Sequence, residues 1–172
     1  LAQPERSAAP ANDAQGDIIV TGTRDPERRL IETIAPVDLL SGTEVQATVT
    51  SDLSATLAQL LPSFNVQRLP LADGAVFVRP ARLRGLSPDH TLVLVNGRRY
   101  HRSALLGNRG AQAPDLASIP SFAIGRVEVL RDGAAAQYGS DAIAGVINIL
   151  LDAEPGFHAF GPVSYTHLTL PT

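Results

Sequence analysis

The feature that most constrains the fold is a buried strand that runs straight into a tight turn. Thr91–Val95 is an unbroken apolar run of strand-forming residues, and Asn96-Gly97 follows it. Asn-Gly suits a two-residue type I′ turn because both of its positions need a positive φ. Arg98-Arg99-Tyr100 then returns as the second arm. The segment therefore predicts an antiparallel hairpin.

Several other short segments have strand character, and they are mixed with short helices. Strands are predicted at residues 36–40, 64–68, 81–85, 126–130 and 145–150, with Leu83, Val127 and Val129 facing inward. Ser41-Gly42 is predicted to form a turn. Because the elements show no regular strand–helix–strand repeat, we expect an α+β fold, a small mixed β-sheet with short helices and long loops.

Three stretches are predicted to be helical. Ser51 or Asp52 caps a helix that Pro62 ends and that places four leucines on one face. Pro120-Ser121 introduces a helical turn, and residues 134–138 form another, with Gly139 in a left-handed cap. The four leucines are Leu53, Leu57, Leu60 and Leu61.

Composition and motifs argue against most catalytic and metal sites. Cysteine is absent, and all 14 basic residues are arginine, which excludes thiolate metal sites and a P-loop lysine. The four histidines lie too far apart for a zinc helix, no serine elbow is present, and no cofactor is indicated. We therefore predict a non-enzymatic binding or gating module, and a hydrolase using Ser140 is the weaker alternative.

Basic residues are concentrated in one stretch. Residues 79–109 hold seven arginines and one acid, Asp89. Such a stretch is either a solvated face or a surface that meets acidic groups. Nucleic acid is not the expected partner, because the isoelectric point is about 5.8 and aromatic residues make up 5%.

Long ordered motifs in the chain resemble the plug domain of TonB-dependent outer-membrane receptors. They comprise residues 82–86, 91–99, 119–120, 124–133 and 134–149. The similarity covers residues 34–152. It implies a domain that blocks the lumen of a β-barrel of about 22 strands in the outer membrane of a Gram-negative bacterium.

An isolated β-prone segment at residues 17–23 resembles a TonB box. It lies between a flexible N-terminus, residues 1–16, and a linker, residues 24–33. The residues alone allow either an edge strand or a strand that docks on a partner's sheet. The resemblance implies pairing with the C-terminal domain of TonB in the periplasm, driven by the ExbB–ExbD motor. The implied contact residues are Asp17, Ile18, Ile19, Val20 and Thr21.

The resemblance also assigns roles to charged and loop residues. Barrel-facing charges are expected at Arg82, Arg84, Arg126, Glu128 and Arg131. Loops 69–77 and 101–113 are expected to face a chelated ligand such as a ferric siderophore. The ligand-facing candidates are Arg68, Leu71, Asp73, Arg102, Asn108 and Arg109. No metal cage is present in these loops, so iron is expected to arrive already chelated.

The chain departs from the family pattern in two ways, since the barrel of several hundred residues is absent and the C-terminal end does not resemble a first barrel strand. Residues 153–172 are expected to be an unstructured tail, and residues 161–172 resemble translated adaptor sequence. The chain begins with Leu1 and contains no methionine. We therefore expect a processed chain or a fragment that cannot transport by itself. A free-standing periplasmic binding module with the same fold is the alternative.

Overall fold

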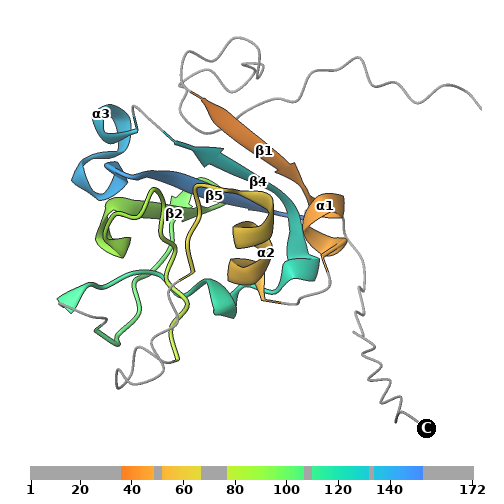
Figure 1. Ribbon diagram of the computed structural model, residues 1–172, viewed down its shortest axis with the longest axis horizontal. Helices are drawn as coiled ribbons and strands as arrows, with labels where there is room; N and C mark the ends of the chain where they lie inside the picture. Colours follow the sequence, from red (N-terminus) through yellow and green to blue (C-terminus); the bar gives the residue numbers. More distant parts are fainter. Residues whose placement is uncertain (1–35, 49–51, 67–76, 107–109, 132–133, 153–172) are drawn as a thin grey trace, which may run out of the picture.

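A five-stranded mixed sheet forms the centre of the computed structural model, with strand order β1-β4-β5-β2-β3. The structure describes residues 36–48, 52–66, 77–106, 110–131 and 134–152. The strands are β1 (Val37–Ser41), β2 (Thr91–Val95), β3 (Arg98–Arg99), β4 (Ile124–Leu130) and β5 (Gly145–Leu151). Figure 1 shows β1 along one edge of this sheet. The small mixed sheet with short helices confirms the predicted fold class.

Strand direction follows from the register. β4 pairs antiparallel with both β1 and β5, so β1 and β5 run in the same direction. β2 lies parallel to β5, and β3 returns antiparallel to β2. The N-terminal end of β4 and the C-terminal end of β5 therefore lie at the same end of the sheet.

The predicted hairpin is confirmed. Asn96 and Gly97 have φ values of 49° and 75°, as a type I′ turn requires. The turn is also fastened to the end of β5. The Asn96 side-chain oxygen accepts from the Leu151 amide at 2.9 Å, and the Asn96 amide donates to the Ile149 carbonyl at 2.9 Å.

The turn expected at Ser41-Gly42 is wrong, because a short helix begins there. Ser41 is the N-cap of α1 (Gly42–Gln46), and its hydroxyl accepts from the Glu44 amide. The Glu44 carboxylate accepts from the Ser41 amide at 2.8 Å. This capping box satisfies donors that the first turn of a helix leaves unpaired.

The predicted leucine-faced helix is α2 (Leu53–Leu60), and Asp52 is its cap. The Asp52 side chain accepts from the Ser54 amide at 2.9 Å. Leu53 and Leu57 are fully buried, Leu61 is buried and Leu60 is partly buried. α2 lies below the sheet in Figure 1 and packs in the main core with Val93, Val127 and Ile147.

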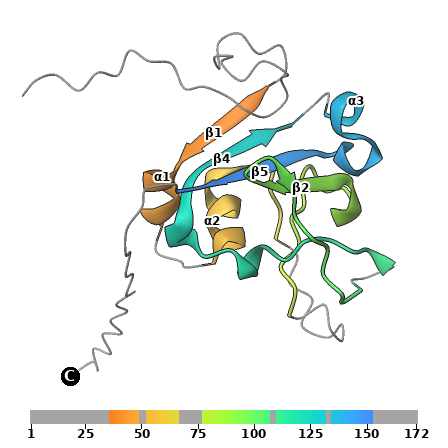
Figure 2. The same ribbon diagram turned by 180° about the vertical axis from the view of Figure 1, so that it is seen from behind.

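The opposite face of the sheet is covered at one end. α3 (Ala135–Tyr138) and the 3-10 turn η7 (Ser140–Ala142) flank this end, which Figure 2 shows from behind. Their segment contributes Ala134, Tyr138 and Ala142 to a second apolar cluster with Leu130 and Val146. Gly139 ends α3 with a φ of 89°.

The predicted turn after Pro120 is η6 (Ser121–Ala123). The other 3-10 turns are η3 (Pro88–His90) and η5 (Leu116–Ser118).

Two predicted strands differ from the structure. Residues 64–66 and 81–83 share one isolated bridge, between Phe64 and Leu83. Residues 67 and 68 lie outside the described residues, as do segments 1–16, 17–23, 24–33 and 153–172. Within the described residues, no helix is long and apolar enough to cross a membrane.

Candidate functional site

The first group of predicted charges lies where β4 ends. Nη2 of Arg131 lies 2.7 Å from Oδ1 of Asp38 on β1. Nη1 of Arg84 donates to the main-chain oxygen of Arg131 at 2.8 Å. The structure therefore brings Arg84 and Arg131 together and adds Asp38, which the sequence did not single out. Asp38 could have been identified only from the β1–β4 register, which the sequence does not show.

Arg84 occupies a backbone conformation that side chains other than glycine rarely adopt. Its φ is 56°, Gly85 follows with a φ of 71°, and the Leu86 amide bonds to the Leu83 carbonyl at 3.1 Å. The predicted strand therefore ends in a tight turn after Leu83. Arg82 supports this turn by donating to the carbonyls of Leu86 at 2.8 Å and Gly85 at 2.9 Å. The result is that an exposed Arg84 is presented on a strained, braced turn.

The second group lies at the other end of β4, and its carboxylate is buried. Nη2 of Arg126 is 3.1 Å from Oε1 of Glu128, whose side chain is 0% exposed, while that of Arg126 is 29% exposed. Asn148 on β5 donates to Oε2 of Glu128 at 3.3 Å. The prediction that Glu128 faces outward is therefore wrong. Its side chain is covered because the sheet is buried on this face as well.

The five expected barrel-facing residues thus do not form one cluster. Arg126 and Arg131 are five residues apart along an extended strand, which corresponds to about 16 Å. Arg84 and Arg131 meet at the β4 C-terminal end, Arg82 bonds within the turn that follows Leu83, and Arg126 lies near the start of β4.

A third group ties the hairpin to the η7 segment. Oδ2 of Asp141 lies 2.6 Å from Nη1 of Arg99 and 3.3 Å from Nη2 of Arg102. Nη2 of Arg99 also donates to the Tyr138 carbonyl at 2.6 Å. Asp141, Arg99 and Arg102 border a small cavity of about 80 Å³ that Tyr100 also lines. Of the six ligand-facing candidates, Arg102 is the one within the described residues.

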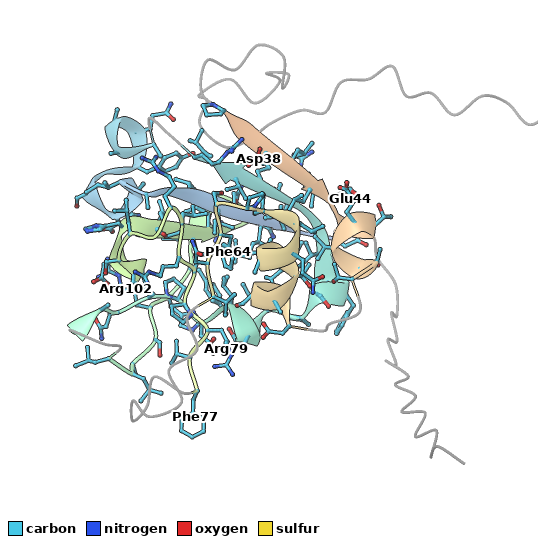
Figure 3. All side chains as sticks on the ribbon, in the orientation of Figure 1. Asp38, Glu44, Phe64, Phe77, Arg79 and Arg102 are labelled. Carbon is cyan, nitrogen blue, oxygen red and sulfur yellow. The ribbon has the colours of Figure 1, made fainter. Side chains whose placement is uncertain are left out.

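The described segments that flank the two predicted ligand loops are hydrogen-bonded to one another. Pro80 and Asp115, one beside each loop, form an isolated bridge. Within the second loop, the Ser103 amide donates to the Ala113 carbonyl at 3.1 Å. Phe77 is 76% exposed and Leu106 is 61% exposed. Figure 3 shows Phe77 projecting from the side of the molecule opposite Asp38 and β1. This side therefore carries the exposed ring of Phe77.

The remaining candidates cannot be placed. Asp17, Ile18, Ile19, Val20 and Thr21 lie outside the described residues, as do Arg68, Leu71, Asp73, Asn108 and Arg109. Within the described part of the chain, no group of three or more acidic, histidine or cysteine side chains is placed to hold a metal ion.

Comparison with known proteins decides the family. The family model described as "TonB-dependent Receptor Plug Domain" matches residues 29–146. This chain is a member of the TonB-dependent receptor plug domain family. The matched range contains β1 to β4 and the short helices of the plug domain, and it ends at the start of β5.

Named relatives of this plug domain are a transporter and receptors. The chain is 32% identical over 146 residues to the vitamin B12 transporter BtuB of Photobacterium profundum, covering 85% of this chain and 22% of BtuB. It is 34% identical over 161 residues to the rhizobactin receptor of Rhizobium meliloti, covering 87% of this chain and 20% of the receptor. The plug domain therefore spans about a fifth of the length of these curated relatives.

Solved receptors share the fold. The ferric enterobactin receptor PfeA of Pseudomonas aeruginosa matches with a TM-score of 0.54 and 28% identity, over 70% of this chain and 18% of PfeA. The siderophore receptor PirA of Acinetobacter baumannii matches with a TM-score of 0.53 and 30% identity, over 67% of this chain and 17% of PirA. These matches do not favour the free-standing periplasmic module.

Proposed function

We propose that this chain is the plug and TonB-docking part of a receptor for energy-coupled uptake across the outer membrane of a Gram-negative bacterium. The observation that carries the proposal is the plug-domain match over residues 29–146. In this role the plug domain blocks the lumen of the receptor's β-barrel of about 22 strands.

The coupling strand in this proposal is the TonB box, residues 17–23. Asp17, Ile18, Ile19, Val20 and Thr21 add to a sheet edge of the TonB C-terminal domain through main-chain hydrogen bonds. The ExbB–ExbD motor then pulls on this strand. Four consecutive β-branched residues, 18–21, favour the extended conformation that such pairing requires.

The barrel wall is the proposed partner of the arginines at the two ends of β4. Arg84 and Arg131 serve one end and Arg126 the other, and glutamates of the wall accept from them. Arginine suits this contact because its planar guanidinium can bond a carboxylate through two N–H groups. Arg82 contributes mainly by bracing the turn that presents Arg84.

A chelated nutrient is the proposed ligand, and a ferric siderophore is the specific proposal. Arginines suit anionic chelates, and exposed apolar groups such as Phe77 suit the aromatic or alkyl parts of such ligands. The proposed contacts are Arg68, Leu71, Asp73, Arg102, Asn108 and Arg109. Vitamin B12 is the ligand named for BtuB and is the competing candidate.

Calorimetric titration of the purified 172-residue chain with the TonB C-terminal domain tests the docking role. We expect saturable binding that falls at least about tenfold in Ile19→Pro, because proline removes a strand N–H donor. Ala14→Pro is the matched control, since it introduces the same residue outside residues 17–23 and should leave binding unchanged.

Two results would contradict the proposal. One is the absence of heat and of any chemical-shift change on adding TonB to the wild-type chain. The other is binding that Ile19→Pro and Ala14→Pro weaken equally, which would place the contact elsewhere.

A further inference from the structure

A buried polar row of two residues, Glu128 and Asn148, lies across the neighbouring strands β4 and β5. Glu128 on β4 lies opposite Asn148 on β5, and Asn148 lies opposite Leu94 on β2. Glu128 is fully buried and Asn148 is 1% exposed. Burial of a carboxylate and an amide costs free energy unless both are hydrogen-bonded. The hydrogen-bond partners of Glu128 and Asn148 therefore indicate the role of these two residues.

Each carboxylate oxygen of Glu128 has a described partner. Oε1 faces Nη2 of Arg126 at 3.1 Å, and Oε2 accepts from Nδ2 of Asn148 at 3.3 Å. The buried Nε of Arg126 has no hydrogen-bond partner among the described residues. Among the described contacts of Arg126, the ion pair with Glu128 is therefore the one that orients the guanidinium.

Asn148 connects this pair to the hairpin turn. Its Oδ1 accepts from the Gly97 amide at 3.1 Å. With Oδ1 accepting from Gly97 and Nδ2 donating to Glu128, the amide plane of Asn148 has one orientation that satisfies both bonds. The turn, Asn148, Glu128 and Arg126 thus form one continuous polar chain.

We infer that Glu128 and Asn148 are positioning residues that hold the guanidinium of Arg126 ready for a carboxylate outside the plug domain. This inference rests on the proposed function for the identity of that carboxylate, which lies on the barrel wall. Glu128 and Asn148 act on Arg126 through contacts within this chain. Glu128 holds Nη2 of Arg126, and Nε is buried, but the side chain is 29% exposed, so part of the guanidinium remains accessible at the surface.

Arginine-selective modification of the 172-residue chain with phenylglyoxal tests the positioning. The chain contains no lysine to compete, and site-resolved mass spectrometry reports each arginine separately. Glu128→Gln keeps the shape but puts an NH2 group against Arg126 or Asn148, whichever way the amide lies. In Glu128→Gln, we expect the modification rate of Arg126, divided by that of Arg131, to be at least three times the wild-type ratio.

Asp38→Asn is the matched control. Asp38 pairs with Arg131 at 2.7 Å and is not one of the described partners of Glu128 or Asn148. We expect this variant to raise the rate at Arg131 and to leave Arg126 unchanged. An unchanged Arg126-to-Arg131 ratio in Glu128→Gln overturns the inference, and so does an equal rise at both arginines, which would mean general loosening.

Amide hydrogen exchange at Gly97 supplies a second readout. Asn148→Ala removes the acceptor of this amide and one support of Glu128, so we expect Gly97 to exchange at least tenfold faster and Arg126 to react faster. If Glu128→Gln fails to fold, Asn148→Ala decides, and unchanged rates at both residues overturn the inference. Neither readout involves TonB or a barrel, so a failure here is distinguishable from a failure of the proposed function.

Discussion

Asp141 and Arg99 form the shortest of the described ion pairs, with 2.6 Å between Oδ2 and Nη1. Asp141 belongs to the segment between α3 and β5, and Arg99 belongs to β3. The same carboxylate lies 3.3 Å from Arg102, where the predicted ligand loop begins. One acid thus joins two motifs that are 42 residues apart in sequence.

We expect Asp141→Asn to lower the free energy of unfolding by about 0.5–1 kcal/mol, measured by urea denaturation at low salt. The effect is small because the paired side chains are half exposed, and exposed pairs contribute little. In about 1 M NaCl the difference should shrink through screening. Arg98→Gln on the same strand is the control and should be neutral, and a salt-independent loss in Asp141→Asn would contradict the ion-pair explanation.

The positive φ of Arg84 predicts that glycine is more stable than alanine at this position, which is the reverse of the usual order. Both Arg84→Gly and Arg84→Ala lose the bond to the Arg131 carbonyl, but only glycine relieves the φ of 56°. We expect Arg84→Gly to be more stable than Arg84→Ala by about 1 kcal/mol in denaturant unfolding. At Arg98, within strand β3, the order should be reversed, because glycine weakens a strand. The same order at both positions would count against backbone strain at Arg84.

Gly42 packs against the backbone of β4. A Cβ at this position would lie 2.5 Å from the Ile124 carbonyl oxygen and 2.7 Å from that of Gly125. We expect Gly42→Ala to cost about 2 kcal/mol or more, with a lower Tm in calorimetry, because α1 must move away from the sheet. In Gly125→Ala the nearest atom would be 3.4 Å away, so that variant should lose much less. Equal losses in the two variants would show that α1 adapts.

The capping box predicts a pH dependence. Hydrogen bonds from the Ser41 amide, and then from its hydroxyl, hold the pKa of Glu44 below its ordinary value of 4.5. A carboxyl whose pKa is lower in the folded chain stabilises that chain fully above the unfolded pKa, and the gain is lost as pH falls through the folded pKa. We therefore expect the stability advantage of wild type over Glu44→Gln to decrease below about pH 4.5. The measurement is urea unfolding between pH 3 and 7.

Ser41→Ala is the control for this prediction. It removes the hydroxyl that bonds Oε2 of Glu44 at 2.7 Å and leaves the amide in place. The pH dependence attributable to Glu44 should become smaller in this background. A difference between wild type and Glu44→Gln that stays constant across this pH range would refute the role of the cap.

Local patterns were sufficient for elements whose signals lie within a few residues. Asn96-Gly97 and the leucine spacing from Leu53 to Leu61 each predicted an element that the structure contains. Ser41 was misread because Ser-Gly suits a turn as well as a cap, and the deciding residue is Glu44, three positions on.

The charged site was harder to predict because it depends on strand order. Alternation along β4 placed Glu128 on the face opposite Val127, which is correct, but it could not show that this face is also covered. Asp38, Asn148 and Asp141 acquire their roles only through neighbours that are distant in sequence. The arginines were recognised by type and motif, and their separation into two groups follows from the length of β4.

The parallel direction of β1 and β5 has a mechanical consequence. The described chain enters the sheet at Val37 on the edge strand and leaves it at Leu151, and these points lie at opposite ends of the sheet with β4 between their strands. A tension between the two points acts along the strands, in shear. The five residue pairs that join β1 to β4 must then yield together and cannot open one at a time from an end.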